Sequence, residues 1–397
     1  MRNLLGYVTV AAVMAVLLGG AGCSSGSPSN PGDQDSDHAE NETEAPLCDA
    51  ADWGAYGVGA TAITLTDASR QDRELPVLVV YPTATRPDYR VCEAAFLEES
   101  ILWRYSEATM CAQQDAPAAT DGAPFPVVFL SHGSGSMKEG YTYLEEYLAS
   151  HGFVVVAPDH TGNVGLSQFA PADTSMSYTR LADMRFVMDE MTAAFDNPQS
   201  PFHGLGDEAR MGMAGHSWGG HAAVVMAGMA YNYEKIAAEC AAGTQVDQYQ
   251  CPLLAHRDEI ESMTPDTRLR AVVSWAHDIG KASQPGGPVC FGASGVHIPW
   301  MMMLGDEDPY LVWQEDGQDC YDKAGGTACL VTLSGAGHMG YTDMGNEKTM
   351  EDERMYLLVR RYSTAFFMRH LMDIGSCQEA MDRQALDDGA DHTRECK

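Results

Sequence analysis

The sequence predicts an α/β protein: one domain on a mostly parallel sheet, with helices on both faces and two insertions. Short apolar runs alternate with longer segments of helical spacing, which is typical of parallel strands joined by helical crossovers. A serine flanked by glycines, in Gly215–Gly219, lies between one such run and a helix. Hydrophobic residues make up 45% of the 397 residues, enough to fill the core of a large domain.

The strands are predicted from apolar runs bounded by turn residues. The first two, joined by a polar segment, should form an antiparallel hairpin that opens the sheet. In chain order the predicted strands are Ala60–Thr66, Leu75–Tyr81, Pro126–Leu130, Phe153–Ala157, Met211–Ala214, Leu269–Ala276, Ile298–Leu304 and Cys329–Leu333.

The helices are predicted from apolar residues that recur at helical spacing, as Leu181, Met184 and Met188 do. Residues 83–121 and 231–267 interrupt the alternation of strands and helices and are interpreted as insertions. Residues 373–397 are expected to be a tail held by disulfides. The predicted helices are Tyr141–Ser150, Tyr178–Phe195, residues 218–229 and Met350–Met372.

The N-terminus has the features of an export signal. Arg2 precedes an apolar run from Leu4 to Leu18, which is too short to span a bilayer comfortably, and small residues lead to Cys23. This arrangement resembles a bacterial lipoprotein box, which implies that residues 1–22 are removed and Cys23 carries the lipid. We expect a membrane-anchored bacterial lipoprotein facing the periplasm or the exterior. Ordinary secretion as a soluble protein is the alternative.

Residues 23–46 follow the signal and differ in composition from the rest of the chain. Beyond Cys23 they are polar and acidic, with no basic residue and almost nothing apolar. Such a segment cannot bury enough surface to offset its ordering entropy, so it should be a flexible tether. The folded domain is then expected over residues 47–397.

The charge of the chain limits its partners. Its formal net charge is −32 at pH 7. A protein this acidic repels phosphate backbones, so binding of nucleic acid through a basic surface is excluded.

The eleven cysteines fit an oxidising compartment. With Cys23 assigned to lipidation, ten remain, an even number that allows disulfides. Spacing favours local pairs, which leaves two cysteines for a long-range pair. No spacing typical of a zinc site occurs, and we expect no metal and no cofactor. The expected pairs are Cys92–Cys111, Cys240–Cys251, Cys320–Cys329, Cys377–Cys396 and Cys48–Cys290.

Ser217 is the predicted nucleophile. It is the central residue of Gly215-His216-Ser217-Trp218-Gly219, between a strand and a helix. A sharp turn there exposes the hydroxyl, and glycines are needed where side chains would collide with the neighbouring strand and helix.

A nucleophilic serine needs a base, and in this strand–turn–helix arrangement the order is Ser, acid, His. His338, in a glycine-rich loop after the last predicted strand, is the expected base. Asp308 is the first choice for the acid because it follows a strand within a G-x-x-D turn. Asp278, after the preceding strand, is the alternative acid, and Asp306 is the third candidate.

Attack by a serine nucleophile on a carbonyl group creates an oxyanion, which needs backbone N–H donors. One is expected from Trp218, which follows the nucleophile, and the other from Ser134, in the His132-Gly133-Ser134 turn after a strand. For His216 and His221, which flank the serine, a packing or supporting role is expected. His160 is expected to shape the rim of the site.

Several of these segments together resemble a branch of the α/β-hydrolases that contains the secreted platelet-activating-factor acetylhydrolases. Bacterial dienelactone-hydrolase-like and polyester-hydrolase (cutinase-like) proteins are similar too. The resemblance covers roughly residues 55–372. The segments are Asp67–Arg70, Val79–Pro82, Leu130–Gly133, Leu148–His160, Gly215–Gly220 and Gly337–His338.

This resemblance implies an α/β-hydrolase fold and cofactor-free hydrolysis of carboxylic esters through an acyl-enzyme. The acetylhydrolase pattern favours Asp278 as the acid, and the polyester-hydrolase pattern favours Asp308. Dienelactone hydrolases proper use a cysteine nucleophile, so Ser217 argues against their substrate.

The prediction is therefore an exported serine esterase acting on a small-molecule, phospholipid or polyester ester and attached to a membrane through its N-terminal lipid. A non-catalytic surface binding lipoprotein on a hydrolase scaffold is one alternative. A peptidase or amidase that uses the same triad is the other.

Overall fold

The computed structural model describes residues 48, 50–85, 112–165, 175–243, 250–277, 290–343, 352–382, 389 and 391–397. All of them belong to one compact unit, Ala45–Lys397. The predicted signal, Cys23 and the tether lie outside the described residues, as do Cys92 and Cys111. The domain boundaries therefore stay predictions.

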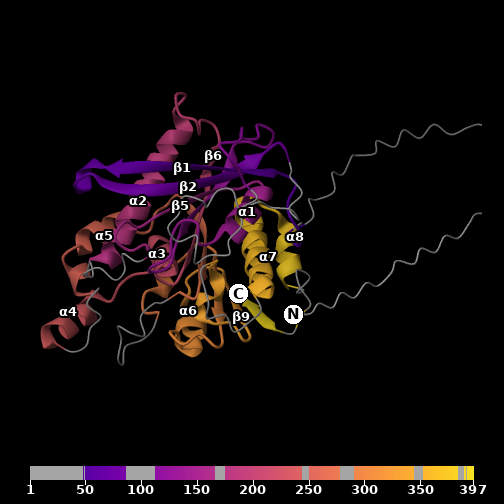
Figure 1. Ribbon diagram of the computed structural model, residues 1–397. Coiled ribbons are helices and arrows are strands. Elements are labelled where there is room, and N and C mark those ends of the chain that lie inside the picture. The colour runs from indigo at the N-terminus through magenta and orange to yellow at the C-terminus, as the bar shows by residue number, and fades with distance from the viewer. Residues whose placement is uncertain are drawn as a thin grey trace, which may run out of the picture. The chain divides into compact units, whose positions relative to one another are not determined.

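One mixed sheet forms the centre of the unit (Figure 1). Its strands lie side by side in the order β10-β9-β8-β7-β6-β4-β5-β2-β1-β3. In chain order they are β1 (Gly57–Asp67), β2 (Arg73–Thr83), β3 (Gln113–Gln114), β4 (Phe125–Ser131), β5 (Val154–Pro158), β6 (Gly206–His216), β7 (Leu269–Trp275), β8 (Trp300–Gly305), β9 (Ala328–Leu333) and β10 (His392–Cys396).

The adjacent strands β5, β4, β6, β7, β8 and β9 are parallel, so their carboxyl ends meet at one edge of the sheet. The hairpin β1–β2 joins β5 antiparallel, and β10 joins β9 antiparallel at the other end. Strands β4 and β5 are buried along their whole length, which explains why they read as continuous apolar runs.

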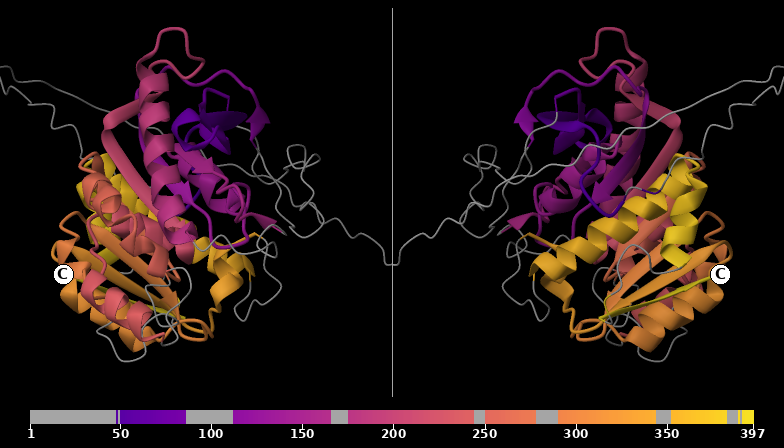
Figure 2. Two further views of the ribbon diagram at one scale, coloured as in Figure 1. Left: turned by 90° about the vertical axis from the view of Figure 1, so that its left-hand side faces the viewer. Right: turned by 90° about the vertical axis from the view of Figure 1, so that its right-hand side faces the viewer.

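Helices cover both faces of this sheet. Helix α7 packs on β6, β7 and β8 and contacts α1, which packs on β1, β2 and β5. Helices α2 and α3 pack on each other and against β4 and β6. Figure 2 shows α7 in front of the sheet in one view and α2 in front of it in the opposite view. The helices are α1 (Thr142–Ser150), α2 (Met176–Asp196), α3 (Trp218–Met226), α4 (Tyr233–Ala242), α5 (Arg257–Met263), α6 (Asp319–Lys323), α7 (Asp352–Leu371) and α8 (Gly375–Asp382).

Each predicted strand and helix is present, and the mostly parallel α/β class is confirmed. The main boundary error is β6, which begins at Gly206 rather than Met211. Its first residues are polar and partly exposed, and they extend the strand by pairing with Phe125 and Pro126 ahead of a bulge. None of the helices that the structure describes combines the length and hydropathy needed to cross a membrane.

The C-terminal tail is more ordered than predicted, because residues 392–396 form the edge strand β10. In its register Cys396 is the direct partner of Cys329, and the two form a disulfide. The preceding helix α8 carries Cys377, which is bonded to Cys48 at the start of the unit. The expected pair Cys377–Cys396 is therefore wrong.

Two further expected pairs are also wrong, Cys320–Cys329 and Cys48–Cys290. Cys290 and Cys320 are bonded to each other instead. Only Cys240–Cys251, within the second insertion, is confirmed among the described cysteines. Spacing along the chain failed as a guide because the sheet and its helices bring distant cysteines together, whereas Cys240 in α4 and Cys251 in the short helical turn Cys251–Leu254 are only 11 residues apart.

The second insertion, residues 231–267, contributes α4 and α5. Each buries one isoleucine against the core: Ile236 from α4 and Ile260 from α5. Helix α5 contacts α2, so the insertion is attached to the face of the sheet that carries α2 and α3.

Candidate active site

Ser217 lies in a tight turn where β6 passes into α3. Its backbone has φ 53° and ψ −120°, a conformation that non-glycine residues rarely adopt. A Cβ atom at Gly215 would overlap the carbonyl of Gly219, and one at Gly219 would overlap the carbonyl of Ser131. The glycines are therefore required for the close packing of the turn between neighbouring strands.

His338 and Asp308 reach this serine from two other strand ends. The His338 imidazole lies 2.9 Å from Ser217 Oγ through Nε2 and 2.7 Å from Asp308 Oδ2 through Nδ1. A carboxylate can only accept, so Nδ1 carries the proton and Nε2 is free to accept from the serine hydroxyl. The structure thus places Ser217, His338 and Asp308 in one hydrogen-bonded series.

The Asp308 carboxylate is held on both oxygens. Oδ2 accepts from His338, and Oδ1 accepts from the backbone N–H of Tyr310 at 2.8 Å. The Asp308 side chain is 1% exposed. The Tyr310 ring, among the most exposed large apolar side chains described, lies edge-on to the imidazole with ring centroids 4.9 Å apart.

The other acid candidates do not share this position. Asp306 accepts from the backbone N–H of Gly335 at 2.7 Å and so braces the loop that carries His338. Asp278 lies outside the described residues. The roles of Ser217, His338 and Asp308 in a reaction remain predictions, with Asp308 placed at hydrogen-bond distance from the imidazole.

The turn after β4 lies against the serine. A Cβ atom at Gly133 would stand 2.8 Å from His216 Nδ1 and 3.5 Å from Ser217 Cβ, so this turn and the serine turn are in contact. The Ser134 hydroxyl accepts a hydrogen bond from the Asn163 amide at 3.1 Å. Trp218 is the first residue of α3, as expected for a backbone donor beside the nucleophile. The donation of hydrogen bonds by Trp218 and Ser134 to an oxyanion remains a prediction.

Arg180 of α2 holds this turn from beneath. Its guanidinium is buried and donates to the backbone carbonyls of His132 at 2.5 Å and Gly133 at 3.2 Å, and to Asn163 Oδ1 at 3.1 Å. Burial lowers the pKa of Arg180 to about 9. No pattern in the sequence indicated this role, since an arginine on an amphipathic helix ordinarily faces solvent.

The expectation that His160 shapes the rim of the site is wrong, because the structure buries this residue completely. Its Nε2 lies 2.9 Å from Ser131 Oγ, and its Nδ1 lies 3.0 Å from Asp183. Asp183 also accepts hydrogen bonds from Arg70 and Arg73 of the opening hairpin. Burial acts to raise the pKa of Asp183, but the hydrogen bonds from Arg73 and His160 outweigh it and hold this pKa well below the usual range. Burial lowers the pKa of His160 to about 4.

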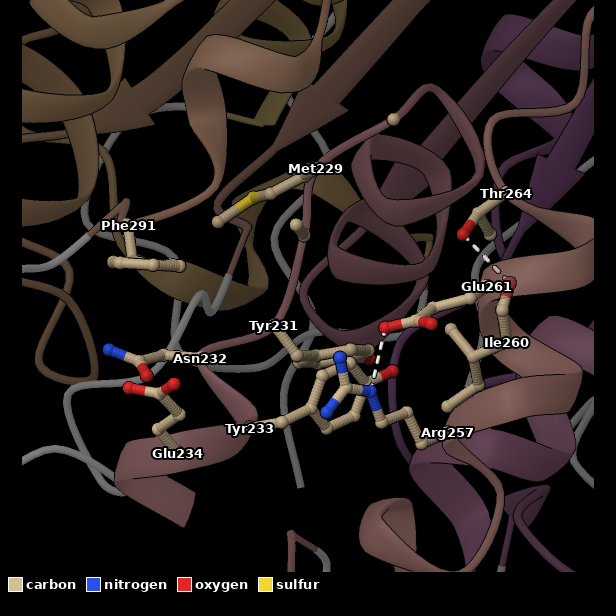
Figure 3. A pocket seen from close by; sticks show the side chains of 12 residues that line it. Met229, Tyr231, Asn232, Tyr233, Glu234, Arg257, Ile260, Glu261, Thr264 and Phe291 are labelled. Atoms are coloured by element: carbon tan, nitrogen blue, oxygen red, sulfur yellow. Dashed lines mark hydrogen bonds and ion pairs between the residues drawn. The ribbon is translucent and has the colours of Figure 1, made fainter. Parts of the chain in front are cut away.

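A separate cavity of about 530 Å³ lies beyond the C-terminal end of α3 (Figure 3). The insertion supplies much of its lining. The Arg257 guanidinium lies 4.8 Å from the centre of the Tyr233 ring and is paired with Glu261 at 2.8 Å. Tyr231 and Phe291 also line it, whereas Ser217 does not. Within the residues described, no group of three His, Cys, Asp or Glu side chains is arranged to hold a metal ion.

Comparisons with known proteins point to ester hydrolases. The family model for chlorophyllase matches residues 116–252. Over 67 residues the chain is 33% identical to platelet-activating factor acetylhydrolase of Cavia porcellus, a match that spans 17% of this chain and only 15% of that protein.

A ferulic acid esterase from Streptomyces cinnamoneus has a similar fold, with a TM-score of 0.57 and 24% sequence identity. The similarity covers 80% of this chain and 91% of that structure. Together with the parallel sheet and the serine turn at its carboxyl edge, these similarities confirm the fold that the sequence resemblance implied. The chain therefore has an α/β-hydrolase fold, and the proteins it is similar to are esterase-type members of that superfamily.

Proposed function

We propose that the protein is a serine esterase that hydrolyses carboxylic esters through an acyl-enzyme intermediate. The observation that carries this proposal is the hydrogen-bonded series Ser217–His338–Asp308 at a strained turn. A hydroxyl within 2.9 Å of an imidazole whose other nitrogen is fixed by a buried carboxylate has the arrangement that nucleophilic catalysis needs.

In this reaction Ser217 Oγ attacks the ester carbonyl carbon while its proton passes to His338 Nε2. The carbonyl oxygen becomes an oxyanion, stabilised by the backbone N–H groups of Trp218 and Ser134. Collapse of the tetrahedral intermediate breaks the bond to the alcohol, which takes the proton from His338. Water then repeats the sequence on the acyl-enzyme and releases the acid, while Asp308 stays ionised throughout.

The substrate in this proposal is a small-molecule, phospholipid or polyester ester, and the protein works outside the cytoplasm on a lipid anchor at Cys23. The names of the similar proteins, an acetylhydrolase and a ferulic acid esterase, support an acyl ester. The disulfides Cys48–Cys377, Cys240–Cys251, Cys290–Cys320 and Cys329–Cys396 support an oxidising compartment.

The test is covalent labelling of the folded, oxidised protein with a fluorophosphonate, followed by mapping of the labelled residue. We expect Ser217 to be labelled, and Ser217→Ala to lose both labelling and about 10⁶-fold in ester turnover. Comparison of p-nitrophenyl esters with the matching anilides separates an esterase from an amidase. A wild-type protein that turns over ester but carries no label at Ser217 would contradict the proposal.

A further inference from the structure

His216 directly precedes Ser217, and its ring is buried beside the site. Through Nε2 it lies 2.9 Å from the backbone carbonyl of His338. Through Nδ1 it lies 3.0 Å from the hydroxyl of Tyr141, in the turn that leads into α1. The His216 side chain therefore connects the loop that carries His338 to the segment that follows β4.

The direction of each hydrogen bond follows from the chemistry of the partners. A carbonyl only accepts, so His216 Nε2 carries a proton and donates it to His338. Burial lowers the pKa of His216 well below its usual range, so the ring is neutral and Nδ1 is an acceptor. Tyr141 consequently donates its hydroxyl proton to His216 Nδ1.

The Tyr141 hydroxyl in turn accepts from the backbone N–H of Gly133 at 3.0 Å. Gly133 precedes Ser134, the proposed oxyanion donor. The series from the N–H of Gly133 through Tyr141 and His216 to the carbonyl of His338 has no mismatched donor or acceptor. It spans the turn after β4, the turn after β6 and the loop after β9, which supply the oxyanion donors, the nucleophile and the base.

We infer that Tyr141 and His216 are positioning residues that hold the His132-Gly133-Ser134 turn and the main chain of His338 at a fixed separation around Ser217. The inference rests on the proposed function, because it concerns the geometry of that reaction. Neither residue touches the reacting atoms. Misplacement of catalytic groups by about 1 Å can cost about 100-fold in rate, so a loss of this bracing should lower kcat.

The opposing interpretation is that these are ordinary hydrogen bonds of the core. The chain contains a matched control for it, because the Tyr362 hydroxyl lies 2.8 Å from His392 Nε2, and both residues are buried. This second tyrosine–histidine pair joins α7 to β10, and neither of its members contacts Ser217, His338 or Asp308 by hydrogen bond. Removal of either hydroxyl should cost stability, because buried groups that it bonds to are left unpaired.

The experiment compares Tyr141→Phe with Tyr362→Phe in the full-length oxidised protein. Thermal unfolding, kcat and KM for a p-nitrophenyl ester, and the rate of fluorophosphonate labelling are measured for each. We expect both variants to lose stability, Tyr141→Phe more than Tyr362→Phe, because the backbone N–H of Gly133 also loses its partner. Tyr141→Phe alone should lower kcat and the labelling rate at least about tenfold, with KM changed by less than about threefold.

Equal kcat values in the two folded variants would overturn the inference. If Tyr141→Phe does not fold, His216→Gln is measured against His392→Gln with the same criterion. If fluorophosphonate does not label Ser217 in the wild-type protein, the proposed function is wrong, and the positioning role is wrong with it. The labelling of wild-type protein therefore separates the two failures.

Discussion

Replacement of Asp308 by asparagine tests the proposed triad most sharply, because both oxygens of this carboxylate face donors. Oδ2 accepts from His338 Nδ1 at 2.7 Å, and Oδ1 accepts from the Tyr310 backbone N–H at 2.8 Å. Asparagine keeps one oxygen and puts an NH₂ group in place of the other. One of the two donors must then face another donor, whichever way the amide is turned.

If the NH₂ group faces His338, the imidazole must take the tautomer with its proton on Nε2, and it can no longer accept from Ser217. If the NH₂ group faces Tyr310 instead, a buried backbone N–H loses its partner, which costs about 1–3 kcal/mol. In both orientations the negative charge that stabilises the imidazolium is gone. We expect kcat to fall by about 10⁴, or about 5.5 kcal/mol in activation free energy, as when a triad histidine is held in the wrong tautomer.

The assay is the hydrolysis of a p-nitrophenyl ester by Asp308→Asn, with Asp306→Asn and Asp278→Asn measured in parallel. Asp306 is the matched control, because it lies two residues away and its carboxylate accepts from the backbone N–H of Gly335 instead of from His338. Its variant should keep kcat within about tenfold of wild type, since only the loop that carries His338 loses a contact. If Asp278→Asn lost more activity than Asp308→Asn, the assignment of the acid would be wrong.

Three further predictions concern other parts of the chain. Arg180→Met should lower the unfolding free energy in urea by about 3 kcal/mol, because the buried His132 carbonyl and the Asn163 side-chain oxygen lose their guanidinium donor; an unchanged midpoint would contradict this. The pKa values of buried His160 and His277 are lowered to about 4 from an ordinary 6.5, so below pH 6.5 the unfolded chain binds protons that the folded chain does not. Stability should therefore fall between pH 6.5 and pH 4, by roughly 2 kcal/mol for each ring at pH 5, and denaturant titrations showing no such decline would refute it. Cys23→Ala should move the protein from the membrane fraction to the soluble fraction, and unchanged fractionation would reject the lipid anchor.

Much of the site could be predicted because short, local sequence motifs mark its residues. Gly215 and Gly219 around Ser217 are required by the contacts of a single turn, so they mark it in the sequence. The positions of Asp308 and His338 after apolar strands placed them at the carboxyl edge of a parallel sheet. The choice between Asp308 and Asp278 stayed open in the sequence because both follow a strand, and the structure places Asp308 at hydrogen-bond distance from the imidazole.

By itself, then, the sequence determined the alternation of strands and helices, since each apolar run need only match the period of its own element to be recognised. Tertiary structure alone decided the disulfides Cys48–Cys377, Cys290–Cys320 and Cys329–Cys396. It also decided the pairing of β10 with β9. It also decided the buried polar contacts of Arg180, His160 and Tyr141. These depend on which segments the folded sheet brings together across long stretches of chain, and no residue's immediate neighbours carry that information.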